Sequence, residues 1–468
     1  MTAVRTAAIA NLGCKVNQSE MEATARLLRE RGVAVVDGGQ PADLVVVNTC
    51  TVTSVADEKS RQAVRRARRA NPKAQIVVTG CSVQVGRAAF AAVDPAARLI
   101  DNRAKDGLLD EIERLIGAPV APQAVDRTGL IDRPLPTLSG VEIDGIVDGR
   151  ASVERTRAFI KVQDGCSFFC TYCIIPAARG PERSLSPETV LQEVRRALRA
   201  GHREIVLTGI NIGTYDGGSS QRGYRGSHLR PALTLAGLVR RLLDETTVER
   251  IRLSSIEPQH VDDELLGVWA DGGPTTLPHL HLPLQSGDDG VLRRMGRRYL
   301  TADYRAVVER VRRAIPGVAV HADVIVGFPT EDQAEWARSL AFIREMDFAG
   351  LHVFRYSARP GTAAIRMRGQ VDEATKKRRA AELLAIGLEA RTRWAAAHVG
   401  SEVEVLVEES VRDGRWVGHA RDHTLVAVTG STSRPLQNEI VGVAVDRVDP
   451  FVPERVEGHV VTSIGATP

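Results

Sequence analysis

The stretch Cys166-Ser167-Phe168-Phe169-Cys170-Thr171-Tyr172-Cys173 places three cysteines within one short loop. A disulfide between two of them would strand the third, and a closed structural zinc site takes four protein ligands. The nearest histidine in sequence, His202, lies well outside the loop. Three thiolates instead match a [4Fe-4S] cluster in which one iron keeps an open position. The plainer alternative is three unrelated buried thiols.

Length and composition bound the class of protein. The chain has 468 residues, which allows two or three domains, and its 43% hydrophobic and 26% charged content is typical of a folded protein with sizeable cores. It shows neither an apolar run of about 18 residues nor a secretory leader, so we expect a cytoplasmic protein without a membrane contact. The formal net charge of +4 leans only mildly towards nucleic acid.

The N-terminal third alternates strand-like and helix-like segments. Apolar runs predict strands at 5–11, 44–47 and 75–78, and helical spacing predicts helices at 20–31 and 57–70. This alternation indicates a doubly wound parallel sheet, part of an α/β fold.

The remaining three cysteines each follow one of these strands. Cys14, Cys50 and Cys81 come just after the first, second and third strand. Open α/β sheets bind ligands at the carboxyl ends of their strands, so we expect the three thiols to meet in one crevice. They form a second candidate site for a [4Fe-4S] cluster with an open iron. The alternative is that they are buried small hydrophobic side chains.

The central part of the chain repeats a strand–helix unit six times. The strand 158–162 leads into the cysteine loop, and five further strands follow with helices between them. This pattern predicts a partial (β/α)6 barrel, whose site lies at the carboxyl ends of the strands. A glycine-rich insert at 215–231 looks like a lid.

The cysteine loop resembles the signature of the radical S-adenosylmethionine (SAM) enzymes, with Tyr172 as the aromatic residue before the last cysteine. The resemblance implies that SAM chelates the open iron of the cluster. One electron then cleaves SAM to methionine and a 5′-deoxyadenosyl radical, which abstracts hydrogen from unactivated carbon. The cofactor supplies this chemistry, and the protein supplies position and exclusion of water.

The N-terminal third resembles the radical SAM methylthiotransferases. The resemblance rests on the stretches 11–18 (Asn-Leu-Gly-Cys-Lys-Val-Asn-Gln), 48–53 (Asn-Thr-Cys-Thr-Val-Thr) and 79–81 (Thr-Gly-Cys), and 11–18 together with 57–62 resembles the MtaB type. Ser19 and Ser82-Val83 depart from the common pattern. The resemblance implies methylthiolation of carbon 2 of N6-threonylcarbamoyladenosine beside the tRNA anticodon. It also implies two [4Fe-4S] clusters, of which the N-terminal one handles sulfur, and a second SAM that donates methyl.

Strand ends supply candidate contacts to SAM. Gly209 and Asn211 follow the second core strand, Ser254 and Glu257 follow the third, and Asp323 and Gly327 belong to the fifth. Glycine lets backbone approach a ligand, and Ser254 or Glu257 could bond a ribose. The stretches around Gly209 and Asp323 resemble the family's contacts to the SAM amino group and adenine. A glycine or serine at a strand end can also simply form a turn.

From about residue 400 short alternating runs predict a small antiparallel β-barrel similar to a TRAM domain, which binds RNA in this family. Residues 400–468 carry six arginines, no lysine and eleven acids, a balance of −5 that disfavours phosphate binding. The predicted helix at 57–70 carries five arginines, which either contact phosphate groups of a nucleic acid or simply form a solvated helix face.

These observations predict four segments: an N-terminal domain at 1–118, a linker at 119–150, a radical SAM core at 151–396 and a TRAM-like barrel at 397–468. The expected partners are the tRNA anticodon stem-loop, SAM, an external electron donor and a sulfur source. Two alternatives stay open. One is a sibling methylthiotransferase acting on isopentenyladenosine in tRNA or on a ribosomal protein aspartate. The other is a non-catalytic iron–sulfur protein that binds RNA or acts as a sensor.

Overall fold

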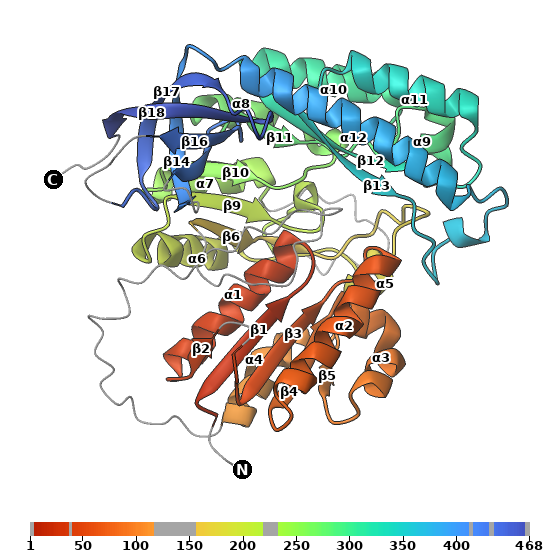
Figure 1. Ribbon diagram of the computed structural model, residues 1–468, viewed down its shortest axis with the longest axis vertical. Coiled ribbons are helices and arrows are strands. Elements are labelled where there is room, and N and C mark those ends of the chain that lie inside the picture. Colours follow the sequence, from red (N-terminus) through yellow and green to blue (C-terminus); the bar gives the residue numbers. More distant parts are fainter. Residues whose placement is uncertain are drawn as a thin grey trace.

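A computed structural model describes residues 4–36, 40–116, 156–218, 233–410, 415–429 and 435–463. It shows three folded parts, with the N-terminal domain packed against a central barrel and a small β-barrel at the C-terminal end (Figure 1). The predicted linker at 119–150 and most of the predicted lid at 215–231 lie outside the described residues. Within them, no helix is both long and apolar enough to cross a bilayer.

The N-terminal domain is a five-stranded parallel sheet in the order β2-β1-β3-β4-β5. The strands are β1 (Thr6–Asn11), β2 (Ala34–Val36), β3 (Leu44–Thr49), β4 (Gln75–Gly80) and β5 (Arg98–Ile100). The helices are α1 (Lys15–Glu30), α2 (Ser54–Ala70), α3 (Cys81–Val93) and α4 (Leu108–Ile116).

Alternating strand residues build a core on each face of this sheet. Val46 and Val77 face α1 and α4, whose Leu28 and Ile112 are fully buried. Their neighbours in the same strands pack against α2 and α3 on the other face. Successive side chains of a strand point to opposite faces, so continuous apolar strands need helices on both sides. The doubly wound sheet predicted from the sequence is therefore confirmed.

The central barrel consists of six parallel strands in chain order, held as two three-stranded sheets. Its strands are β6 (Arg157–Lys161), β9 (Glu204–Thr208), β10 (Arg250–Leu253), β11 (His279–His281), β12 (Ala319–Val326) and β13 (Gly350–Arg355). Bridges from Ile251 to Thr276 and from Ser255 to His281 join the two sheets. The predicted partial (β/α)6 barrel is confirmed.

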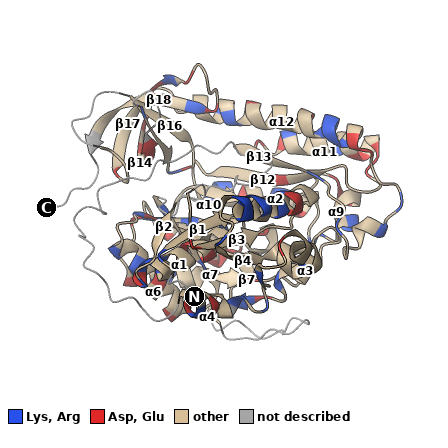
Figure 2. Cartoon of the chain, turned by 60° about the horizontal axis from the view of Figure 1, so that its bottom comes forward, with Lys and Arg blue, Asp and Glu red and all other residues tan. Residues whose placement is uncertain are grey.

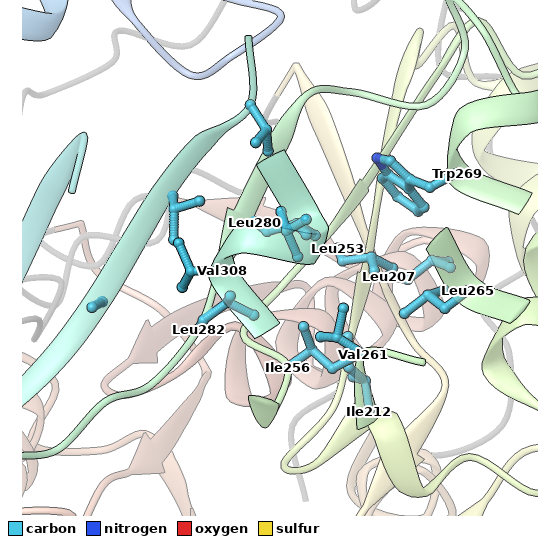
Figure 3. Close-up of a cluster of buried hydrophobic side chains, with 14 of the residues drawn as sticks. Leu207, Ile212, Leu253, Ile256, Val261, Leu265, Trp269, Leu280, Leu282 and Val308 are labelled. Atoms are coloured by element: carbon cyan, nitrogen blue, oxygen red, sulfur yellow. The ribbon is translucent and has the colours of Figure 1, made fainter. Parts of the chain in front are cut away.

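Helices cover the outside of this barrel. They are α6 (Pro187–Arg199), α7 (Leu235–Glu245), α8 (Asp263–Asp271), α10 (Thr301–Ala314), α11 (Gln333–Glu345) and α12 (Glu373–Ala396). The short β7 (Gln163–Asp164), α5 (Ile175–Arg179) and β8 (Arg183–Ser184) flank the cysteine loop, and α9 (Asp289–Met295) follows β11. Leu207, Leu253 and Leu280 from neighbouring strands meet α8 side chains in a buried apolar cluster (Figure 3). Each buried leucine contributes about 2 kcal/mol.

The C-terminal part is a closed five-stranded barrel in the order β14-β15-β16-β18-β17. Its strands are β14 (Glu402–Ser410), β15 (Trp416–Ala420), β16 (Leu425–Thr429), β17 (Ile440–Val448) and β18 (Arg455–Ser463). Pairing is antiparallel except between β16 and β18, which run parallel and close the barrel. The predicted small barrel is thus present, with one parallel pair that the sequence pattern did not reveal.

Candidate functional site

The cysteine loop lies at the carboxyl end of the first barrel strands, between β7 and α5. Gly165, at φ +72°, starts the loop, and a Cβ there would lie 1.9 Å from the carbonyl oxygen of Pro181. The Cys166 amide donates to the carbonyl of Gly180 over 3.0 Å, and the Thr171 amide donates to the carbonyl of Met295 over 2.9 Å. The backbone is therefore fixed at both sides of the three thiols.

The three thiols suit a cationic inorganic partner. Burial raises the pKa values of Cys166 and Cys173 to about 12, so as free groups they remain protonated. A bound metal deprotonates such thiols outright. A closed structural zinc site takes four protein ligands, and this loop supplies three thiols, which is the number that leaves an open position on a [4Fe-4S] cluster.

Arg297 is a functional candidate that the sequence reasoning did not identify as such. Its Nη1 donates to Cys170 Sγ over 3.4 Å and to the hydroxyl of Tyr172 over 3.3 Å. Its Nη2 pairs with Glu257 and donates to Tyr299 over 2.8 Å. The side chain is 3% exposed. Its position after α9, far from the cysteines in sequence, gave no local signal.

Unpartnered polar atoms line the same end of the barrel. Neither the amide oxygen nor the amide nitrogen of buried Asn211 has a hydrogen-bond partner among the described residues, and Ser254 Oγ has none either. A Cβ on Gly209 would lie 2.8 Å from Ile212 Cγ2 and 2.9 Å from Gln163 Oε1. Buried polar groups are normally paired, so these atoms are suited to a polar ligand such as SAM. Their predicted role as SAM contacts stays a prediction.

The other predicted SAM contacts already have protein partners. Glu257 pairs with Arg297, and burial raises the pKa of Glu257. The Gly327 amide donates to Glu331 over 2.7 Å, and a Cβ at Gly327 would lie 2.4 Å from Lys376 Cγ. Here glycine is needed for packing whether or not a ligand binds.

Asp323 lies between two imidazoles. Its Oδ1 is 2.8 Å from His281 Nε2 and 3.3 Å from His352 Nδ1. Although burial opposes it, contact with these rings holds the pKa of Asp323 below its usual range. The three side chains, from β12, β11 and β13, could hold a single ion, and they equally form a closed hydrogen-bonded set. His352 was not noticed in the sequence.

The second set of cysteines meets at the carboxyl edge of the N-terminal sheet. Cys14 precedes α1 as its N-cap, Cys81 is the first residue of α3, and Cys50 directly follows β3. A Cβ on Gly13, at φ +119°, would lie 3.0 Å from Cβ of Cys50. Burial first, then the nearby Cys81 thiol, raises the pKa of Cys50 to about 12. Cys14 and Cys81 thus lie at helix N-termini, which favour negative charge, and their role as cluster ligands stays a prediction.

Contacts across the domain interface link the segments that carry the two cysteine sets. Helix α5, which follows the cysteine loop, packs against α3, which begins with Cys81. Arg179, the last residue of α5, donates from Nε to Cys81 Sγ over 3.2 Å. Asn102 also links the two parts, because its Nδ2 lies 3.4 Å from Cys81 Sγ and 2.7 Å from the Ala178 carbonyl.

The basic helix is α2, on the surface of the N-terminal domain (Figure 2). Arg65, Arg66 and Arg69 are exposed. Arg68 instead pairs with Asp94 over 2.9 Å and donates to the carbonyl of Ala74, so it holds the domain together.

The described arginines of the C-terminal barrel are all engaged within the protein. Arg415 and Arg447 pair with Glu457, and Arg455 pairs with Asp449. Arg421 donates to the carbonyls of Gly273 and Thr276 in the core. These contacts leave the exposed face of α2 as the better-placed group of cations for phosphate.

Comparisons with known proteins agree with this arrangement. Residues 160–343 match the Radical SAM superfamily, and residues 6–100 match the uncharacterized protein family UPF0004. A solved radical SAM methyltransferase, TsrM from Kitasatospora setae, shares the fold with a TM-score of 0.51, at 14% identity over 77% of this chain and 74% of that one. The fold and the cysteine loop define a radical SAM enzyme.

Curated relatives narrow the class. The threonylcarbamoyladenosine tRNA methylthiotransferases MtaB of Bacillus subtilis and Thermotoga maritima are 37% and 35% identical, covering 91% and 89% of each chain. A tRNA-2-methylthio-N(6)-dimethylallyladenosine synthase of Erythrobacter litoralis is 32% identical, over 88% of this chain and 89% of that one. The chain therefore belongs to the radical SAM methylthiotransferase family.

Proposed function

We propose that this enzyme transfers a methylthio group to carbon 2 of N6-threonylcarbamoyladenosine next to the tRNA anticodon. The two sets of three cysteines, whose segments are linked across the domain interface by Arg179 and by packing of α5 on α3, support this proposal most directly. Two curated relatives, 37% and 35% identical to this chain, are named for the same substrate. In this proposal the enzyme acts in the cytoplasm, where its tRNA substrate is found. Its electron donor and its sulfur source are separate molecules that the chain does not supply.

Each cysteine set holds one [4Fe-4S] cluster in this proposal. Cys166, Cys170 and Cys173 bind the cluster that chelates SAM, and Cys14, Cys50 and Cys81 bind the one that handles sulfur. When bound, cluster and SAM together supply hydrogen abstraction that no side-chain base provides. In this proposal Asn211 and Ser254, whose buried polar atoms have no partner among the described residues, orient SAM, and Arg297 fixes the loop around Cys170. The buried surroundings exclude water from the reacting atoms.

The proposed domains are the N-terminal domain at 1–118, the linker at 119–150, the core at 151–396 and the barrel at 397–468. The separate hydrophobic cores of the N-terminal sheet, the central barrel and the C-terminal barrel support this division. We propose that the TRAM-like barrel positions tRNA by a few contacts while α2 supplies more of the electrostatic affinity.

Mass spectrometry of nucleosides from tRNA of cells with and without the gene tests the substrate. We expect the methylthiolated threonylcarbamoyladenosine to disappear and its unmethylthiolated parent to accumulate. Loss of the isopentenyl derivative instead would keep the chemistry and change the substrate. No change in either nucleoside would favour a ribosomal protein substrate or a non-catalytic iron–sulfur protein. Release of 5′-deoxyadenosine from SAM under reducing conditions distinguishes these two, because a non-catalytic protein releases none.

A further inference from the structure

We propose that Arg179 is a positioning residue for the N-terminal cluster: its guanidinium, supplied by the radical SAM core, donates to the Cys81 ligand and raises the cluster's reduction potential. This inference rests on the second cluster of the proposed function. It assigns a part of the N-terminal cysteine site to the other domain.

The guanidinium of Arg179 is held in one orientation. Besides Nε to Cys81 Sγ at 3.2 Å, its Nη1 donates to Asp164 over 2.8 Å and to Glu20 over 3.2 Å, and its Nη2 donates to Asn17. The side chain is 1% exposed. The planar fork of arginine holds these several acceptors at once, so the Nε–H is fixed on the sulfur.

The charged side chains around Arg179 include an excess of cations. Lys105, Lys161 and Arg179 surround Glu20, and both Arg179 and Arg183 pair with Asp164. Four cations therefore face two carboxylates, and Lys161 and Arg183, at 27% and 45% exposed, are the two that reach solvent. An anionic Cys81 sulfur, 3.2 Å from Nε, adds a further negative charge beside the buried guanidinium. The site is therefore suited to a thiolate, as in a metal-bound cluster.

A hydrogen bond and a positive charge at a ligand sulfur stabilise the reduced, more negative cluster. The contact crosses between domains, because Cys81 begins α3 of the N-terminal sheet and Arg179 ends α5 of the core. The reduction potential of the N-terminal cluster should therefore depend on the docked core.

The test uses the full-length chain with Cys166, Cys170 and Cys173 replaced by Ala, so that only the N-terminal cluster remains. Its midpoint potential is measured by redox titration followed by electron paramagnetic resonance. Arg179→Gln should shift the potential to a more negative value. Arg183→Gln is the matched control, because Arg183 also pairs with Asp164, over 3.0 Å, but its side chain is 45% exposed. Equal potentials in the two variants would overturn the proposal.

Two further measurements keep the outcomes separate. If the Arg179→Gln variant retains no iron, the Arg179→Lys variant is titrated in its place. Lysine keeps the positive charge but lacks the Nε donor. A midpoint potential in Arg179→Lys that equals the parent value would contradict the role of the hydrogen bond. Iron and sulfide content of the parent variant tests the cluster itself. No iron there would remove the second cluster, and this proposal with it, while radical SAM cleavage of the wild-type chain would still stand.

Discussion

Arg297 links the cysteine loop to the wall of the barrel, and its removal should damage the radical SAM site specifically. In Arg297→Met the Glu257 carboxylate, 18% exposed, loses its cation, and Cys170 and Tyr172 lose a donor. Loss of such a supporting contact typically lowers metal affinity or activity by about 10- to 100-fold. We expect that decrease in release of 5′-deoxyadenosine from SAM.

The control for Arg297 is Arg293→Met. Arg293 is an exposed arginine in α9, a few residues earlier in the chain. The Arg293→Met variant should cleave SAM at the wild-type rate. If both variants lose activity equally, the effect belongs to this segment's packing and not to the contact with the cysteine loop.

His398 and Asp422 form an ion pair whose contribution to stability should depend on pH. The His398 Nε2 lies 2.9 Å from Asp422, and its Nδ1 faces the Trp394 carbonyl at 3.0 Å. Bonding to Asp422 raises the pKa of His398. Because the folded pKa is raised, the stabilisation is fully present below the unfolded value of about 6.5 and is lost as pH rises through the folded pKa.

Calorimetric unfolding of wild type and His398→Gln checks this pH dependence. We expect wild type to be more stable by about 1 to 2 kcal/mol near pH 5.5, with the difference shrinking towards about pH 9. A difference that does not change with pH would show that His398 acts by packing. Asp422 is not the source of the change in this window, because although burial opposes it, bonding to His398 holds the Asp422 pKa at about 2.

At the residue scale, a site could be predicted from the sequence where a single uncommon residue type, cysteine, supplies all its expected ligands. Six cysteines at strand ends and in one loop were enough to predict two sites. Arg179, Arg297 and His352 could not be predicted, because arginine and histidine occur widely and their roles depend on which distant sulfur or carboxylate they reach. Such partners are set by tertiary packing, which a local pattern does not contain.

At the scale of elements, helix α2 should contribute to tRNA binding through its exposed arginines. Replacing Arg65, Arg66 and Arg69 by Gln should weaken binding uniformly across tRNA species. If all three contact phosphates, the slope of log affinity against log salt should fall by about 2 to 3. Filter binding of tRNA at several salt concentrations measures both quantities.

A matched control removes the same charge from the helices of the central barrel. Arg313 in α10, Arg344 in α11 and Arg378 in α12 are exposed as well. Their replacement by Gln should leave the salt slope unchanged. Equal weakening by both triple variants would mean that net charge, and not the face of α2, governs the affinity. Arg68 is left in place because its pair with Asp94 is structural.

Elements with strong periodicity could be predicted, and weakly patterned ones could not. Helices α1 and α2 begin at Lys15 and Ser54, a few residues before their predicted starts. Helix α3 was not predicted, because it begins at the end of a buried strand and contains Gly86 in a non-helical conformation. The parallel pairing of β16 with β18 was likewise invisible, since alternation does not encode strand direction.

At the scale of the whole molecule, Arg359 fastens the N-terminal domain to the core. It is 5% exposed and bonds Thr51 and Asp57 of the other domain. Ser54 and Ser357 add a second contact, in which the Ser54 amide donates over 3.0 Å. Thr51 directly follows Cys50, so these bonds fix the N-terminal cysteine site relative to the core that carries the other cysteine site.

Arg359→Met should therefore uncouple the two sites without abolishing either. Breaking a buried ion pair costs about 3 to 5 kcal/mol. Because each domain keeps its own hydrophobic core, this cost should weaken the docking of the two domains and not the folding of either one. We expect SAM cleavage to persist while methylthiolated nucleoside per 5′-deoxyadenosine falls by about tenfold or more. Arg355→Met is the control, because Arg355 is 42% exposed and pairs only loosely with Glu373, at 3.7 Å. If the product ratio stays at the wild-type value in Arg359→Met, sulfur transfer does not require this docking contact, and the two sites communicate through another part of the interface.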